Sequence, residues 1–261
     1  MSASQPDDMD IMAQEREVRA EAEAAPLVGQ LLSISVLKEQ YATNPGFLPK
    51  VEKLESRFRA LRRTRPDGNC FYRAYLFGIF EQIAGNKERH AAFLQRAKKS
   101  LDFCVGAGYE KVAIEDFYEE FIESVESLAP EGSSASAVEA LLEKNDGYLV
   151  CWARVLTSAY LKRHKEDYEP FLSSHPSIQK FCAQEVDPMN TEADHLQITA
   201  LSCHLGVPVC VVYLDRSEGD SAAEHEFQAQ GGGSDSEHAL TSCQPVHLLY
   251  RPGHYDIIYV Q

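Results

Sequence analysis

The sequence contains no run of about 18 consecutive apolar residues, the length that a membrane-spanning helix needs. Its opening segment, Met1 to Asp10, is polar and acidic, whereas a secretory signal starts with basic residues and continues with an apolar stretch. Basic residues are scarce too: the chain has 25 Lys and Arg but 40 Asp and Glu, so its net charge is −15. Such a surface repels nucleic acid. We therefore expect a protein of the cytoplasm or the nucleus that binds neither membranes nor nucleic acid.

Several motifs of catalysis and metal binding are missing as well. The sequence has no Gly-x-Ser-x-Gly motif and no phosphate-binding loop, and Gly106 to Gly108 lacks the third glycine of a dinucleotide site. The adjacent Cys203 and His204 have no second pair at ligand spacing, so no metal site is expected. No Cys-x-x-Cys pair occurs among the 7 cysteines. Five of them lie within apolar helix or strand patterns and are predicted to be small buried hydrophobic residues: Cys104, Cys151, Cys182, Cys203 and Cys210.

Length and composition favour one folded domain. The chain has 261 residues, of which 44% are hydrophobic and 25% charged, values of an ordinary globular protein. Residues 1–25 are rich in Ala, Glu and Asp, and they are predicted to form a flexible acidic arm. The folded body is expected to comprise residues 26–261.

Hydrophobic periodicity predicts an α+β domain, with helices over the first two thirds and strands gathered at the end. Glu218 to Gln244 is predicted to be a long loop. Apolar residues at helical spacing predict helices over residues 51–61, from residue 71, and over 93–104, 114–128, 149–160, 178–186 and 193–205. Strands are predicted over residues 209–214, 246–250 and 255–260, the last two as a hairpin.

Cys70 differs from the other cysteines in its surroundings. It follows the turn Pro66 to Asn69 and begins an apolar helical run. A turn of this composition leaves backbone N–H groups free to hold an oxyanion, and a helix N-terminus favours a thiolate. From the turn alone, a catalytic nucleophile and a helix start that Asp67 merely caps are about equally compatible with the sequence.

A histidine and a carboxylate near the end of the chain could complete such a site. His254 and Asp256 are two residues apart on a short strand and therefore share one face, so Asp256 could orient the imidazole. Together with Cys70 they would form a cysteine hydrolase site, whose members often lie far apart in sequence. Alternatively, His254 simply meets solvent and Asp256 protects an edge strand. His195, directly after Asp194, is expected to take part in helix capping.

Both segments resemble the motifs of a known family. Residues 64–74 read TRPDGNCFYRA and residues 250–257 read YRPGHYDI. They are similar to the nucleophile and histidine motifs of the otubains, which are deubiquitinating cysteine proteases of the ovarian-tumour (OTU) class. The likeness covers most of the chain from about Pro26 onward, in order, and departs from the family in residues 1–25 and 217–244. It also includes residues 114–117, 156–161 and 184–189.

The resemblance implies a papain-like OTU fold and hydrolysis of isopeptide bonds between ubiquitins, with no metal and no organic cofactor. It implies that Cys70 is the nucleophile, His254 the general base and then the acid, and Asp256 the residue that orients His254. The oxyanion site would be shaped by the turn Asp67, Gly68 and Asn69.

Aspartate at position 256, where some relatives carry asparagine, and the N-terminal arm indicate one branch of the family. That branch implies a preference for polyubiquitin joined through lysine forty-eight of ubiquitin. It also implies binding to charged ubiquitin-conjugating enzymes, which restrains ubiquitin transfer without cleavage. Two alternatives for the main output stay open: cleavage, or inhibition by binding with slow cleavage. A third, an acidic interaction module with an accidental triad, requires that the family likeness be discounted.

Overall fold

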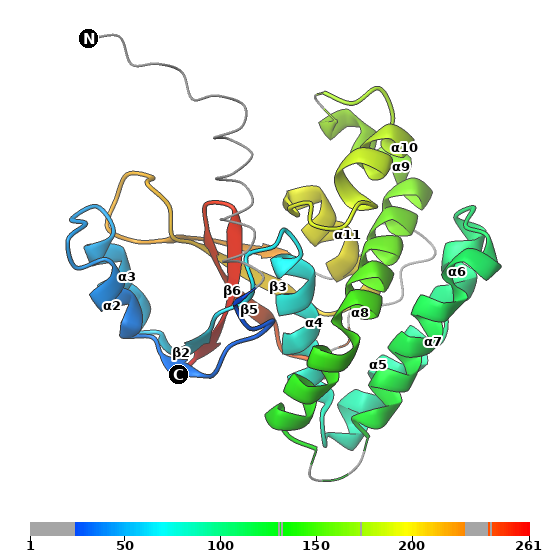
Figure 1. Cartoon of the computed structure of the whole chain (residues 1–261). Helices are drawn as coiled ribbons and strands as arrows, with labels where there is room; N and C mark the ends of the chain where they lie inside the picture. Colours follow the sequence, from blue (N-terminus) through cyan, green and yellow to red (C-terminus); the bar gives the residue numbers. More distant parts are fainter. Residues whose placement is uncertain (1–23, 130, 132, 173, 228–239, 241) are drawn as a thin grey trace.

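The computed structural model describes residues 24–129, 131, 133–172, 174–227, 240 and 242–261. The expected acidic arm, residues 1–25, lies outside this range except for its last two residues. Across the described part, a mixed sheet is covered by helices on both faces (Figure 1). This arrangement confirms the predicted α+β class.

The sheet has six strands in the order β1-β2-β6-β5-β3-β4. Only β3 and β5 run parallel, and every other neighbouring pair is antiparallel. The predicted hairpin at the end of the chain is present as β5 and β6, with Arg251 opposite His254. The strands are β1 (Leu32–Ser33), β2 (Phe58–Arg62), β3 (Val209–Tyr213), β4 (Ala223–Phe227), β5 (Val246–Arg251) and β6 (His254–Val260).

The helices form one large group on one side of the sheet and a small pair on the other (Figure 1). A π turn at Cys182–Val186 and a 3-10 turn at Glu169–Phe171 accompany them. The helices are α2 (Val36–Gln40), α3 (Leu48–Glu55), α4 (Cys70–Ile83), α5 (Lys87–Ala97), α6 (Ser100–Gly106), α7 (Lys111–Ser127), α8 (Ala135–Arg163), α9 (Lys165–Tyr168), α10 (Ile178–Phe181) and α11 (His195–Leu205). None of the described helices combines the length and apolar character that crossing a bilayer requires.

Strand alternation divides the apolar side chains of the sheet between two cores. Leu248 and Ile257 belong to the larger core, which contains α4, whereas their neighbours Leu249 and Ile258 belong to the smaller core under α2 and α3. Successive side chains of a strand point to opposite faces, so both faces of the central hairpin are buried. The hairpin that carries His254 is therefore held on both sides.

Helix α4 connects the sheet to the helical group and positions Cys70. It is apolar on nearly every side, as expected of a helix buried all round, and it packs against β5, β6 and α8. Gly78 allows this close approach, because a Cβ there would lie 2.6 Å from Cγ1 of Val246. The N-terminus of a rigid, fully packed helix is therefore the platform for Cys70.

Two predictions from periodicity are wrong. Residues 58–61 belong to strand β2, not to a helix, because β2 is covered on both faces and its buried Phe58, Ala60 and Leu61 do not alternate with polar residues. The predicted loop 218–244 contains strand β4, whose side chains at the sheet edge are mostly exposed and carry no apolar pattern.

Other boundaries also differ from the prediction. The stretch 93–104 is divided between α5 and α6, and α8 begins well before residue 149. All seven cysteines are free, and four of the five predicted to be buried are buried, whereas Cys151 is only partly so.

Candidate active site

The turn before α4 places Cys70 as the first residue of that helix, where the thiol is almost fully buried. Gly68 adopts a φ of +77°, which a residue with a side chain rarely adopts. An added Cβ would also overlap the carbonyl group of Asn190. The turn therefore needs glycine here for two independent reasons.

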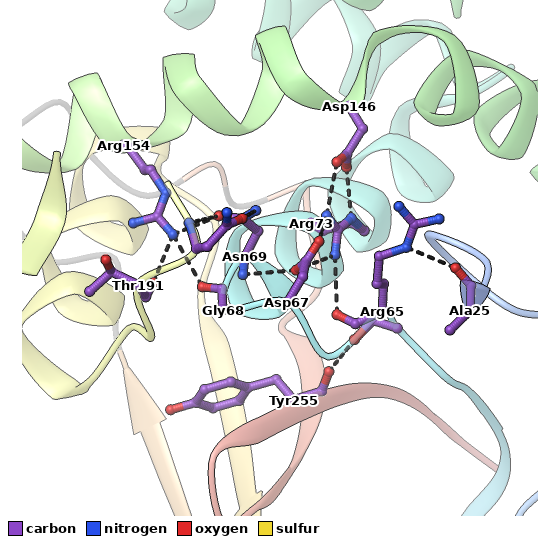
Figure 2. A network of polar contacts seen from close by, with 12 residues as sticks. Ala25, Arg65, Asp67, Gly68, Asn69, Arg73, Asp146, Arg154, Thr191 and Tyr255 are labelled. Atoms are coloured by element: carbon purple, nitrogen blue, oxygen red, sulfur yellow. Dashed lines mark hydrogen bonds and ion pairs between the residues drawn. The ribbon is translucent and has the colours of Figure 1, made fainter. Parts of the chain in front are cut away.

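Asp67 holds this turn through the N–H of Asn69 and is itself held by Arg73 (Figure 2). Its carboxylate accepts the backbone N–H of Asn69 at 3.0 Å and two hydrogen bonds from Arg73, at 3.0 and 2.7 Å. Arg73 also forms two bonds, at 2.8 and 2.9 Å, with Asp146 on α8. Burial raises the pKa of Asp67, but the hydrogen bonds and charge of Arg73 outweigh it and keep the pKa below its usual value. Asp67 thus binds the turn as an anion, and the N-cap position of α4 belongs to Asn69.

The hydrogen bonds of the turn leave two of its N–H donors without a partner among the described residues. The peptide between Gly68 and Asn69 is held on both sides: its carbonyl accepts from Arg154 at 3.1 Å, and its N–H donates to Asp67. The N–H groups of Gly68 and Cys70 make no hydrogen bond with another described residue. Such free N–H groups beside a nucleophile are the donors that an oxyanion requires.

A loop from a distant part of the chain packs on the same turn. The side chain of Asn69 donates to Oδ1 of Asn190 at 2.8 Å and accepts the N–H of Asn190 at 2.9 Å. Asn190 has a φ of 62° and is the one non-glycine residue with positive φ in the described part of the chain. This reciprocal pair fixes the loop before α11 against the nucleophile turn.

His254 begins β6, and its ring contacts Asp256 and lies near Cys70. Nε2 lies 2.8 Å from Oδ1 of Asp256. Nδ1 is buried and makes no hydrogen bond with any described residue. Cys70 nevertheless lies close enough to favour the charged imidazole. Asp256 therefore engages Nε2, Nδ1 is left without a partner among the described residues, and Cys70 lies near the same ring.

Asp256 is completely buried and held by three further groups. Arg63 and Arg251 donate to Oδ2 at 3.0 and 2.6 Å, and the N–H of Thr64 donates to Oδ1 at 3.1 Å. Burial raises the pKa of Asp256, but His254 and the two arginines lower it to about 2. Asp256 is therefore ionised at any physiological pH, and its orientation toward His254 is fixed.

The structure brings together all the site residues that the sequence singled out: Asp67, Gly68, Asn69, Cys70, His254 and Asp256. His195 lies apart from them, and its partner Asp194 caps α11 as expected. Within the described residues, no group of three or more His, Cys, Asp or Glu could hold a metal ion.

Sequence reasoning missed the groups that support these residues. Arg251 could have been found, because a two-residue turn between β5 and β6 places it directly opposite His254. Arg63 is one of three arginines among residues 62–65, and the sequence does not show which of them reaches Asp256. Arg154 and Asn190 carry no local signal, since they reach the turn only through the folded structure.

Replacing Gly68 with alanine is expected to lower the rate of the reaction at Cys70 by about 10²-fold, because the turn must move away from Asn190 and displacements near 1 Å cost that much. The measurement is kcat/KM together with a thermal melting curve. Gly147→Ala is the matched control, since a Cβ at Gly147 on α8 meets open space. Equal activity of the two variants would contradict the importance of the turn geometry.

Comparison with known proteins adds an independent observation. A family model described as Peptidase C65 Otubain matches residues 20–260, which include the whole site. The chain is 37% identical over 252 residues to ubiquitin thioesterase OTUB1 of Homo sapiens, covering 95% of this chain and 89% of that protein. It is 34% identical over 255 residues to an Arabidopsis thaliana OVARIAN TUMOR DOMAIN-containing deubiquitinating enzyme 1, covering 92% and 82%. A chain of the solved structure of h/ceOTUB1-ubiquitin aldehyde-UBC13~Ub superposes with a TM-score of 0.83 at 32% identity, covering 97% and 98%.

Proposed function

The chain belongs to the Peptidase C65 otubain family of cysteine peptidases, and on this premise we propose that it hydrolyses isopeptide bonds in ubiquitin chains. The observation that carries the proposal is that His254, near Cys70, binds buried Asp256 through Nε2 and keeps Nδ1 without a partner among the described residues. The relatives that are named ubiquitin thioesterases, and the solved complex with ubiquitin aldehyde, support ubiquitin as the substrate.

In the proposed mechanism, Cys70 is the nucleophile and His254 exchanges protons with it and with the substrate. His254 takes the thiol proton, and the thiolate attacks the carbonyl carbon of the isopeptide bond. The imidazolium then gives its proton to the departing lysine amine, which leaves a thioester between Cys70 and the ubiquitin C-terminus. Water attacks this thioester with His254 as base, so the ubiquitin carboxylate leaves and the thiol is restored.

Asp256 and the turn have separate tasks in this scheme. Asp256 orients His254 and stabilises its charged form, because it accepts from Nε2 and leaves Nδ1 available for the proton of Cys70. The negative oxygen of the tetrahedral intermediate is held by the N–H groups of the turn, and Asp67 keeps that turn in shape through its bond to Asn69. No step calls for a metal or an organic cofactor.

We propose that the preferred substrate is polyubiquitin joined through lysine forty-eight, as the likeness to the otubain-1 branch implies. A panel of diubiquitins, one for each linkage, tests the function directly by following cleavage on gels. Chains linked through lysine forty-eight should be cleaved fastest. A folded protein that cleaves no linkage would overturn the proposal.

A second function, inhibition of charged ubiquitin-conjugating enzymes by binding, is favoured by one specific finding. Two of the matching solved structures contain UBC13~Ub and UBCH5B~Ub, respectively, together with ubiquitin aldehyde. Ubiquitin transfer by a charged conjugating enzyme should be measured with the wild-type protein and with Cys70→Ala. Equal inhibition by both would establish a function that does not depend on cleavage, whereas inhibition lost with Cys70 would contradict it.

The pKa of His254 predicts how cleavage depends on pH. Burial lowers this pKa, but the hydrogen bond to Asp256 and the proximity of Cys70 raise it to about 9. His254 must be protonated to release the lysine amine, so the rate should decline as the pH rises through about 9. Asp256→Asn removes the charge that favours the imidazolium and should move the decline to lower pH. Profiles of kcat against pH for both proteins check this, and an unmoved decline would contradict the role of Asp256.

A further inference from the structure

A buried arginine lies directly behind the nucleophile turn. Arg154 comes from the middle of α8 and is 1% exposed, and its side chain points at Gly68, Asn69 and Thr191 (Figure 2). Its guanidinium group also lies over the ring of Tyr72, with Cζ 4.3 Å from the ring centre. Helix α8 thus delivers a cation to the side of the turn opposite the sheet hairpin.

The hydrogen bonds of Arg154 connect two segments that are distant in sequence. Nη2 donates to the carbonyl of Gly68 at 3.1 Å and to Oδ1 of Asn69 at 2.8 Å, both in the turn. The same nitrogen donates to the carbonyl of Thr191 at 2.7 Å, and Nη1 donates to that of Val186 at 3.0 Å. One side chain therefore joins the nucleophile turn to the segment 186–191.

The charge of Arg154 is not neutralised by a contacting carboxylate. Its four hydrogen-bond acceptors are neutral oxygens, and it forms no ion pair within the described residues. Arg73 is equally buried but contacts the carboxylates of Asp67 and Asp146. Burying a cation without such a partner is unfavourable, and burial indeed lowers the pKa of Arg154. A neutral donor would hold the same carbonyls without this cost, so the charge itself calls for an explanation.

The position of Arg154 directly behind the two residues before Cys70 supplies an explanation. Arg154 donates to the two residues that precede Cys70, so its charge lies beside the head of α4. Cys70 is the last of the four groups that favour the charged form of Arg154, after Tyr72, Cys151 and Asp67. The attraction is mutual, so a positive Arg154 favours a negative group at the head of α4. Both the thiolate and the oxyanion of the proposed reaction are such groups.

We propose that Arg154 is a positioning residue for the reaction at Cys70, which holds the turn in its working shape and favours negative charge there. This inference rests on the proposed function of the site. Arg154 does not contact the reacting atoms. It acts through the peptide of Gly68 and Asn69, whose opposite side is held by Asp67.

Two substitutions separate the charge from the hydrogen bonds. Arg154→Met keeps a long apolar stem over Tyr72 and removes both, whereas Arg154→Lys keeps the charge and loses the planar fork of donors. The matched control is Arg96→Met. Arg96 on α5 is also buried, and it donates to the carbonyl of His204 at 2.8 Å, away from Cys70.

Steady-state cleavage of diubiquitin is the first measurement. Arg154→Met should lower kcat by about 10²-fold with KM changed less than about threefold, because the loss concerns the transition state and not ubiquitin binding. Arg154→Lys should recover part of that loss, and Arg96→Met should keep kcat. Unchanged kcat in a folded Arg154→Met, or equal losses in Arg154→Met and Arg96→Met, would overturn the inference.

The rate of alkylation of Cys70 by iodoacetamide at neutral pH is the second measurement, and it needs no ubiquitin. It should fall about tenfold or more in Arg154→Met and stay near the wild-type rate in Arg154→Lys, since thiolate reactivity follows the nearby charge. If Arg154→Met fails to fold, kcat of Arg154→Lys tests the inference instead. A wild-type kcat in Arg154→Lys would show that the planar guanidinium donors are dispensable and would overturn the inference. If the wild-type protein cleaves no ubiquitin but alkylation still depends on Arg154, only the proposed function has failed.

Discussion

Cys70→Ala is expected to abolish hydrolysis of diubiquitin, to the limit of detection in an overnight reaction. The thiol is the group that forms the covalent intermediate, and no other side chain at this position of the turn could replace it. Binding of ubiquitin should persist, because the substitution removes one buried sulfur and leaves the turn, its glycine and its supporting arginines in place. Gel-based cleavage and a titration with mono-ubiquitin measure the two effects separately.

The matched control for this prediction is Cys151→Ala. Cys151 is the one cysteine that is only partly buried, and its sulfur lies 3.5 Å from that of Met189 in the loop beside the site. It is thus the cysteine most accessible to a reagent, although it does not adjoin His254. Full activity of Cys151→Ala is expected, and loss of activity there with retention in Cys70→Ala would refute the assignment.

His254→Ala is expected to lower kcat/KM by at least about 10²-fold, the usual contribution of a positioned general base and acid. The substitution also leaves Asp256 buried with its two arginines but without the imidazole, so the carboxylate stays ionised and the hairpin stays paired. The loss should therefore appear in kcat and not as unfolding. Cleavage kinetics and a melting curve distinguish these outcomes.

Two comparisons make the His254 prediction specific. His195→Ala removes an exposed histidine outside the site and should leave the kinetics unchanged. Asp256→Asn should cost less than His254→Ala near neutral pH, because an amide oxygen can still accept from Nε2. A His254→Ala enzyme with wild-type kinetics would show that the imidazole takes no part in the reaction.

The catalytic core of this site could be predicted because its signals are local. Four turn residues followed by an apolar helical run place Cys70 at a helix N-terminus, and the two-residue period of a strand places His254 and Asp256 on one face. The paired strands around a Pro-Gly turn predicted the hairpin that carries them, and the structure has it as β5 and β6.

The supporting contacts could not be predicted, since they depend on how distant segments pack. Arg154 lies 85 positions from Asn69, and Asn190 lies 121 positions from it. The same limit explains the errors in secondary structure. Strand β2 is buried on both faces, and edge strand β4 is mostly exposed, so neither shows the alternation by which strands are recognised.

The central claim is that Cys70, activated by His254, is the nucleophile toward the ubiquitin C-terminus. Reaction of the wild-type protein with ubiquitin that carries a C-terminal electrophile, followed by peptide mass mapping of the adduct, tests it most directly. We predict one adduct per chain, located on Cys70 and absent from Cys70→Ala. An adduct on any of the other six cysteines, or none on a folded protein, would contradict the claim.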